Sequence, residues 1–245
     1  FAPLAGDRYQ PGQAGAALYS GITAHRDTDG WVLSGTARYV LDGDRAEKFA
    51  VVTDGGTFVV DAGLGRVTRT EVFDPVLHVA DVTFADVRVS QDDRVHTDAE
   101  RAHHVALMGM AITTVGACQR ALDLVLAHVR DRHQFGVPIG SFQAVQHKAV
   151  DMHVAIERAR ALAYFSALTV SADDPRRRLA AAMAKAAAGE CQSVVFRHGL
   201  QLFGGMGFTW ENDVQFALKR AKVGELLLGG AAEHRAIIAN EYREL

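Results

Sequence analysis

The hydrophobic pattern of the sequence changes near residue 95, and this change constrains the fold more than any other feature. Before it, short runs of strand-forming residues are separated by turn signals such as Asp29-Gly30 and Asp54-Gly55. From about residue 97, apolar residues recur at helical spacing. The sequence therefore predicts an α+β chain, with a β-domain over residues 1–95 and a helical domain over residues 96–245.

The first part contains the pattern of a small antiparallel β-domain. The apolar runs 49–52 and 57–60 flank Asp54-Gly55, which predicts a hairpin. Residues 79–89 alternate apolar and polar side chains, as a strand with one buried face does. These features favour a barrel or a sandwich.

The second part predicts long helices joined by short loops. We expect helices over about 97–133, from an N-cap at Ser141 onward, and from Asp173 to about residue 202. Two shorter helices follow at about 212–227 and 231–243. This arrangement is typical of an antiparallel helical bundle.

The composition narrows the class of protein. A net charge of −3 with dispersed basic residues gives no reason to expect a nucleic-acid partner. We expect no transmembrane helix and no secretory signal, and therefore a cytoplasmic protein. Cys118 and Cys191 lie in alanine-rich helical surroundings, which favours reduced, buried thiols. Because the sequence begins with Phe1 rather than Met, we expect it to start partway along a longer polypeptide.

Two motifs in the helical part resemble those of the acyl-CoA dehydrogenase family. Residues 132–139 are similar to its Arg-x-x-Phe-Gly-x-x-Ile signature, and residues 201–208 to its Gln-x-x-Gly-Gly-x-Gly-Phe segment. Residues 142–147 and 151–152 follow the first motif at the family's spacing. The resemblance covers nearly all of the chain. The family's N-terminal helical domain has no counterpart here, and the β-domain is expected to be incomplete at its start.

The resemblance implies FAD, held between two subunits of a tetramer. In that family the flavin ring lies against one subunit, and the pyrophosphate and adenosine reach a neighbour. It assigns five residues of this chain to the neighbour's FAD: Arg132, Phe135, Gln201, Gly204 and Gly205. A guanidinium fork suits phosphate oxygens, and glycine permits close backbone approach. The alternative readings are a solvated charge at a helix end for the arginine, and a helix C-cap and turn for the glycines.

The residues that would face this chain's own flavin ring are changed from the family pattern. The ring-packing aromatic is Tyr39, and Leu41 replaces a threonine that would bond to the ring. Gly230 and Ala232 stand where a threonine and a glutamine would contact the same flavin. Donors that flavin binding needs are therefore lost.

The resemblance also implies a glutamate that removes the α-proton of the substrate, at one of two positions. These positions hold Leu228 and Ala106, and neither side chain accepts a proton. Glu225 is a weak candidate for a displaced base, because it lies one helical turn before Leu228. His103, His104 and His234 are possible bases by residue type alone, and surface histidines are the better interpretation. We predict no metal site.

These observations lead to one interpretation of function. We interpret the chain as the non-catalytic subunit of an FAD-dependent acyl-CoA dehydrogenase that resembles the heterotetrameric (α2β2) type. A homologous catalytic subunit would supply the base and the ring pocket. The implied reaction is α,β-dehydrogenation of an acyl-CoA with a steroid- or polyketide-like acyl group, bound through the partner. The implied acceptor is an electron-transfer flavoprotein.

Two other interpretations remain open. The chain could form a homotetrameric dehydrogenase that uses a displaced base such as Glu225. It could also be a flavin-free scaffold or regulatory homologue that keeps the bundle. A family relative with oxidase chemistry is disfavoured, because an oxidase would still need an intact ring site.

Overall fold

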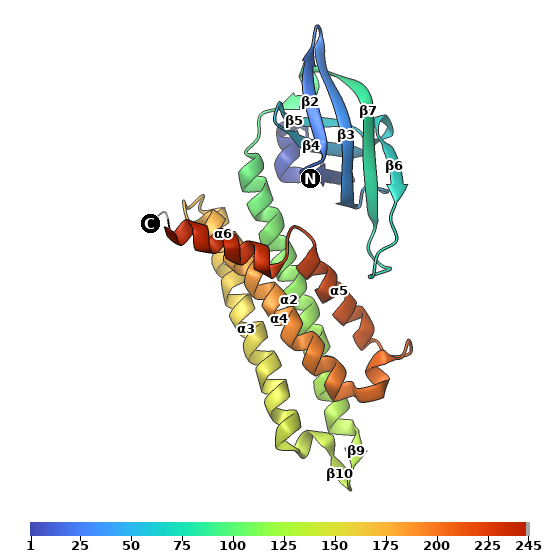
Figure 1. Ribbon diagram of the computed structural model, residues 1–245, viewed down its shortest axis with the longest axis vertical. Helices are drawn as coiled ribbons and strands as arrows, with labels where there is room; N and C mark the ends of the chain where they lie inside the picture. Colours follow the sequence, from blue (N-terminus) through green and yellow to red (C-terminus); the bar gives the residue numbers. More distant parts are fainter. Residues whose placement is uncertain (244–245) are drawn as a thin grey trace. The chain divides into compact units, whose positions relative to one another are not determined.

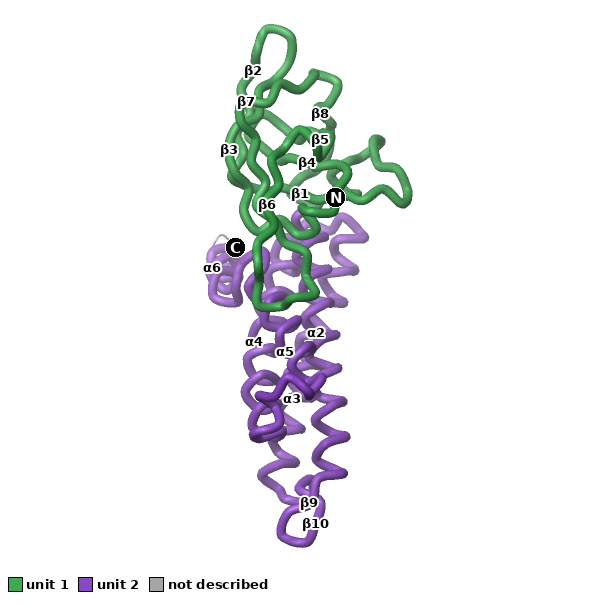
Figure 2. The backbone as a smooth tube through the Cα atoms, turned by 90° about the vertical axis from the view of Figure 1, so that its right-hand side faces the viewer, with its two compact units in different colours: residues 1–102 green, residues 103–245 purple. Residues whose placement is uncertain are grey.

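The computed structural model describes residues 1–243, and the chain divides into two compact units (Figure 2). Unit 1 comprises residues 1–102 and unit 2 begins at His103. The division falls inside helix α2 (Ala99–Asp131), a few residues after the predicted boundary. Each unit contains a hydrophobic core of its own.

Unit 1 is built from two four-stranded sheets, in the orders β1-β4-β5-β8 and β2-β3-β7-β6 (Figure 1). The pairings form two separate sheets, so the sandwich describes the domain better than the barrel. One pairing departs from the expected antiparallel pattern, because β1 runs parallel to β4. The strands are β1 (Gly15–Leu18), β2 (Ile22–Asp27), β3 (Gly30–Leu41), β4 (Lys48–Thr53), β5 (Gly56–Asp61), β6 (Arg66–Arg69), β7 (Val79–Ser90) and β8 (Arg94–Val95).

Both predicted hairpins are present in unit 1. β2 and β3 pair from Asp27 opposite Gly30, and β4 and β5 pair from Thr53 opposite Gly56. The run predicted at 79–89 is the long strand β7, which pairs with both β3 and β6. Apolar side chains alternate along these strands because one face of each sheet packs on a shared core that includes Phe49, Phe58 and Phe84.

Unit 2 is a helical bundle whose helices match the predicted ranges to within a few residues (Figure 1). The predicted N-cap at Ser141 is wrong. Helix α3 starts after Phe142, and the Ser141 hydroxyl instead donates to the carbonyl of Pro138 at 2.7 Å. Besides α2, the elements are β9 (His133–Gln134), β10 (Val137–Pro138), α3 (Gln143–Ser171), α4 (Arg177–Phe203), α5 (Val214–Leu226) and α6 (Ala231–Arg243).

Helix α2 is long and apolar enough, by length and composition, to cross a membrane. Core helices of globular domains meet the same description. Its apolar residues lie in the bundle core beside those of α4 and α5, and include Ala111, Val115 and Leu122. Burial inside the bundle therefore accounts for part of the apolar character of α2.

The two cysteines are free and buried, as predicted. Cys118 on α2 and Cys191 on α4 belong to the same core, and their thiols are hydrogen-bond partners. This contact, followed by burial, raises the pKa of the Cys118 thiol above its ordinary value. Both thiols therefore behave as small core side chains.

Helices α2 and α5 approach so closely that one contact requires a glycine. A Cβ atom built on Gly224 would overlap Oγ1 of Thr114, which is fully buried and bonded to the carbonyl of Met110 at 2.8 Å. The hydroxyl cannot move away without losing that bond, so the contact fixes the spacing of the two helices.

We therefore expect Gly224→Ala to lower the free energy of unfolding by about 1–3 kcal/mol through overpacking. Gly109→Ala is the matched control, because Gly109 is exposed on α2 and a Cβ there meets nothing within 4 Å. That control should raise stability by about 0.5–1 kcal/mol. Urea unfolding, monitored through the helical circular-dichroism signal, measures the free energy of unfolding of both variants. Equal stability of the two variants would contradict this packing.

Candidate functional site

The first predicted motif forms a short hairpin at one end of the bundle (Figure 1). The backbone amide of Arg132 continues α2 by donating to His128 at 2.9 Å, and the Arg132 carbonyl accepts from Ile139 at 2.8 Å. Between β9 and β10, Phe135 has a φ of 55° and is 93% exposed. A large aromatic held in the left-handed region and left in solvent indicates a surface that another group covers.

The second predicted motif follows the C-terminal end of α4. Gln201 is exposed on the last turn, and Gly204 has a φ of 61° and a ψ of −141°, a conformation that only glycine adopts readily. A Cβ built on Gly204 or Gly205 would meet nothing within 4 Å. The glycine backbone is therefore open to a group approaching from outside. The helix-cap role also holds, since the amide of Gly204 bonds to Leu200.

An aromatic stack brings the two motifs to the same end of the bundle. The His128 ring on α2 stacks on Phe203 of α4, with centroids 4.6 Å apart and an interplanar angle of 24°. Arg132 lies one turn after His128, and Gly204 directly follows Phe203. Arg132 and Gly204 therefore follow the two stacked residues closely in the chain, and all five residues assigned to the neighbour's FAD are exposed.

The two expected base positions lie in the other half of the bundle. Because Gly224 of α5 packs on Thr114 of α2, and the helices run in opposite directions, the chain after Gly224 passes the first turns of α2 (Figure 1). Ala106 and Leu228 both lie there and are half-buried. At 1.5 Å per residue, Ala106 and Arg132 are about 39 Å apart along α2. This separation exceeds the length of an extended FAD molecule.

Leu228 lies in a short loop between α5 and α6 with unusual backbone geometry. Its φ is 59°, and that of Gly229 is 91°. Nε2 of His234 lies 2.9 Å from the Leu228 carbonyl, which fixes that nitrogen as the donor. The Lys185 ammonium on α4 donates to the carbonyls of Glu225 and Gly229. The loop is thus held by side chains from two helices.

Glu225 has contacts that account for it without a catalytic role. Its Oε2 forms an ion pair with Lys222 at 2.8 Å, and its Oε1 lies 3.5 Å from the amide of Ala231, the first residue of α6. The carboxylate therefore lies at the N-terminus of that helix, where negative charge is favourable.

The histidines near the loop differ from the expected surface residues. His104 and His234 are buried, and His103 is half-buried. Burial lowers the pKa of His103, and the neighbouring His104 and His234 lower it further. Burial is also the main cause that lowers the pKa of His234. The helical periodicity of the sequence did not reveal that these rings gather inside the bundle.

The expected ring-facing segment in unit 1 keeps an unusual backbone. An irregularity in the β3–β7 pairing leaves Tyr39 with a φ of 56° and an exposed side chain, and its amide donates to Oδ1 of Asp81 at 3.1 Å. The following Leu41 offers no side-chain donor. In unit 2, Gly230 and Ala232 also lack side-chain donors. The segment presents an aromatic ring, but the polar contacts to a flavin ring are missing.

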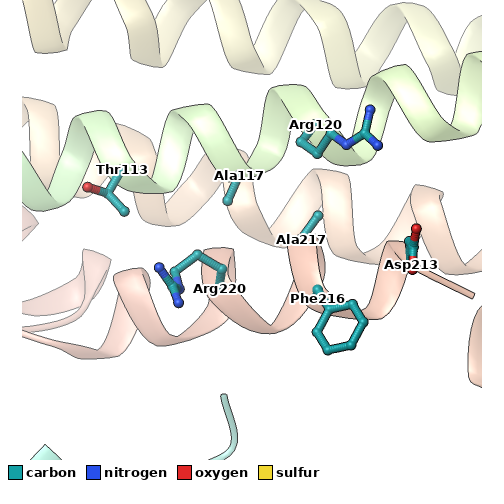
Figure 3. A pocket seen from close by; sticks show the side chains of 7 residues that line it. All are labelled: Thr113, Ala117, Arg120, Asp213, Phe216, Ala217 and Arg220. Carbon is teal, nitrogen blue, oxygen red and sulfur yellow. The ribbon is translucent and has the colours of Figure 1, made fainter. Parts of the chain in front are cut away.

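An open groove of about 490 Å³ lies between α2 and α5 (Figure 3). Arg120 and Arg220 line it, but Figure 3 shows that their guanidinium groups point away from each other. They therefore do not converge on a single anion. The other lining residues are Thr113, Ala117, Asp213, Phe216 and Ala217. Within residues 1–243, no group of three or more His, Cys, Asp or Glu side chains is arranged to hold a metal ion.

Comparison with known proteins agrees with this geometry. Residues 99–242 match the family described as "Acyl-CoA dehydrogenase, C-terminal domain". The chain belongs to the acyl-CoA dehydrogenase family. Over 128 residues it is 41% identical to acyl-CoA dehydrogenase IpdE2 of Mycolicibacterium smegmatis, an alignment that covers 52% of this chain and 39% of the relative.

Two solved structures of the family are similar over most of the chain. The ChsE4–ChsE5 complex of Mycobacterium tuberculosis has a TM-score of 0.87 and 26% identity, covering 94% of this chain and 66% of that one. The Tcur3481–Tcur3483 steroid ACAD has a TM-score of 0.83 and 28% identity, covering 92% and 63%. The chain therefore spans less than two thirds of the length of each of these three relatives.

Members of the family are FAD-dependent flavoproteins. The chemistry of Arg132 and of the open Gly204-Gly205 backbone fits the phosphate and adenosine part of that cofactor, because a guanidinium pairs with phosphate oxygens and glycine permits close backbone approach. The ring-facing segment fits less well, since it lacks side-chain donors. The structure therefore fits one half of a flavin better than the other.

Because His234 is buried, we expect the stability of the bundle to decrease in acid. Because its pKa is lowered in the folded chain, the unfolded chain takes up the proton first as the pH falls through about 6.5. The free energy of unfolding should therefore decrease from that pH downward, until the folded form is protonated as well. His234→Gln should flatten this slope, whereas His153→Gln, at an exposed position of α3, should not. Urea unfolding between pH 7.5 and 5 measures how the free energy of unfolding depends on pH. Equal slopes in both variants would contradict the assignment of this dependence to His234.

Proposed function

We propose that this chain is the non-catalytic subunit of a hetero-oligomeric, FAD-dependent acyl-CoA dehydrogenase. It completes the pyrophosphate and adenosine site of a flavin whose ring is held by a homologous partner subunit. That partner supplies the proton-abstracting carboxylate. The reaction of the complex is α,β-dehydrogenation of an acyl-CoA thioester.

One observation carries this proposal. Ala106 and Leu228 occupy both expected base positions, and neither can accept a proton, whereas Arg132, Phe135 and the glycine pair are present and exposed. The distance of about 39 Å along α2 supports the view that the two groups of residues serve different flavins. A subunit that keeps Arg132 and the glycine pair but lacks a carboxylate at either base position can help bind a flavin without removing the substrate proton.

The names of similar proteins support a heteromeric assembly and a bulky acyl group. One similar structure is a complex of two different chains, ChsE4 and ChsE5, and another is a steroid ACAD. We therefore propose a heterotetramer (α2β2) that acts on a steroid- or polyketide-like acyl-CoA. An electron-transfer flavoprotein in the cytoplasm is the proposed electron acceptor.

The displaced base Glu225 gives the alternative, a homotetrameric dehydrogenase. The ion pair with Lys222 and the position at the start of α6 argue against it, because both contacts need the carboxylate where it is. The two proposals make opposite predictions for Glu225→Gln. In the heteromer the flavin-loaded complex keeps its activity, and in the homotetramer the variant binds flavin without turnover.

The flavin content of the complex tests the subunit role. Co-expression with the homologous chain should give a complex that contains equal amounts of both subunits and two flavins per four subunits. The purified chain alone should bind no flavin stoichiometrically and should not oxidise an acyl-CoA. Flavin absorbance and quantitative mass spectrometry of the subunits measure these ratios. One FAD for each copy of this chain alone, together with dehydrogenation, would overturn the proposal.

The role of Arg132 predicts a loss of flavin affinity in that complex. Arg132→Ala removes charge-assisted hydrogen bonds to the pyrophosphate, and FAD should dissociate about 10- to 100-fold more readily. The matched control is Arg130→Ala, an exposed arginine on the same last turn of α2. Fluorescence titration of the apo-complex with FAD compares the two. A flavin-free scaffold would show no FAD binding in any of these samples.

A further inference from the structure

A lysine is buried completely inside the bundle. Lys185 lies on α4 within the alanine-rich run 180–188, and its exposed fraction is 0%. Its Nζ donates to the carbonyl of Glu225 at 2.9 Å and to that of Gly229 at 2.6 Å. An ammonium removed from water at such cost persists when it is fully engaged by acceptors. The first acceptor lies in the last turn of α5, and the second lies in the loop between α5 and α6.

The loop that Lys185 holds is strained. Leu228 lies in the left-handed region, which is unfavourable for a residue other than glycine and persists only where the surroundings enforce it. The two Lys185 contacts flank Leu228 on either side in the sequence, and His234 bonds to the Leu228 carbonyl between them. Three backbone carbonyls of a short segment thus receive donors from α4 and α6.

The side chain of Leu228 takes no part in these bonds. The hydrogen bonds from Lys185 and His234 go to backbone carbonyls, so they do not require a particular side chain at position 228. Close packing adds to this, because a Cβ on Gly189 of α4 would lie 2.9 Å from Cγ of Glu225 and 3.0 Å from Cβ of Ala231. Helix α4 therefore packs directly against both ends of the loop.

We propose that Lys185 is the positioning residue of the loop 226–230, and that its buried ammonium sets the direction in which residue 228 points. The side chain at position 228 is thereby presented at a fixed place, although in this chain that side chain is a leucine. This inference concerns the chain itself and does not depend on flavin binding or on a partner subunit.

The charges around Lys185 give the inference a distinctive test. Burial lowers the pKa of Lys185 to about 8, and the nearby Glu225 and Glu233 oppose this shift. His234 also faces the ammonium, which lowers the pKa of that histidine. An ordinary exposed lysine stays protonated beyond pH 10. Titration of Lys185 therefore separates its effect on the loop from that of other lysines.

The test follows the carbonyl ¹³C resonances of Glu225 and Gly229 in the full chain between pH 6.5 and 9.5. Both carbonyls accept from Nζ, so both resonances should shift with a common midpoint near pH 8. The midpoint should disappear in Lys185→Met, which keeps the length of the side chain and removes the donor. Lys222→Met is the matched control, since Lys222 bonds the nearby Glu225 carboxylate and is partly exposed.

Hydrogen exchange supplies the second readout at pH 7. Amides 226–231 should exchange at least about tenfold faster in Lys185→Met than in the parent chain, while the central amides of α4 keep their protection. Lys222→Met should leave the loop protected. If Lys185→Met does not fold, the titration of the parent chain still tests the inference. Carbonyl resonances that stay flat across pH 8, or a midpoint that survives in Lys185→Met, would overturn the inference.

Discussion

The fixed rise of the α-helix is the constraint on which the organisation of unit 2 depends. Helix α2 is 33 residues long, with one of the two expected base positions near its start and Arg132, which we propose binds phosphate, just after its end. At 1.5 Å per residue this geometry keeps Ala106 and Arg132 far apart in any state in which the helix is intact. Loss of chemistry at one end can therefore coexist with retained cofactor contacts at the other.

The packing around α4 holds the two ends in place by different means. At one end the His128–Phe203 stack joins the two motifs, and at the other the Lys185 ammonium holds the loop after α5. Small residues between these points, such as those of the run 180–188, let the neighbouring helices approach closely. The buried thiols of Cys118 and Cys191 belong to the same core. One helix thus supports both functional regions.

Much of the fold could be predicted from the sequence, because periodicity reports directly on burial. The switch from alternation to helical spacing located the two parts, and Asp29-Gly30 and Asp54-Gly55 located two hairpins. The parallel β1–β4 pair could not be predicted, since strand pairing depends on contacts between distant segments. The Ser141 cap failed because residues Ile139–Ser141 form a short 3-10 turn and α3 begins only after Phe142. A cap residue is useful only at the position where the helix starts.

The candidate site was predictable only where a motif carried it. Arg132, Phe135, Gln201, Gly204 and Gly205 stand out by spacing, and all five are exposed in the structure. Lys185 was not predicted, although a single lysine inside an alanine-rich run was a visible signal of a buried charge. The burial of His104 and His234 gave no such signal, because histidine occurs on both exposed and buried faces.

The central claim is that this chain serves the adenosine half of a flavin whose ring belongs to another subunit. A structure of the flavin-loaded complex tests it most directly. The account predicts that Arg132 and Gly204 of this chain contact the pyrophosphate and adenosine, and that the ring lies against a partner chain with a carboxylate facing the substrate. A flavin ring seated against Tyr39 of this chain, with Leu228 facing the substrate, would contradict it.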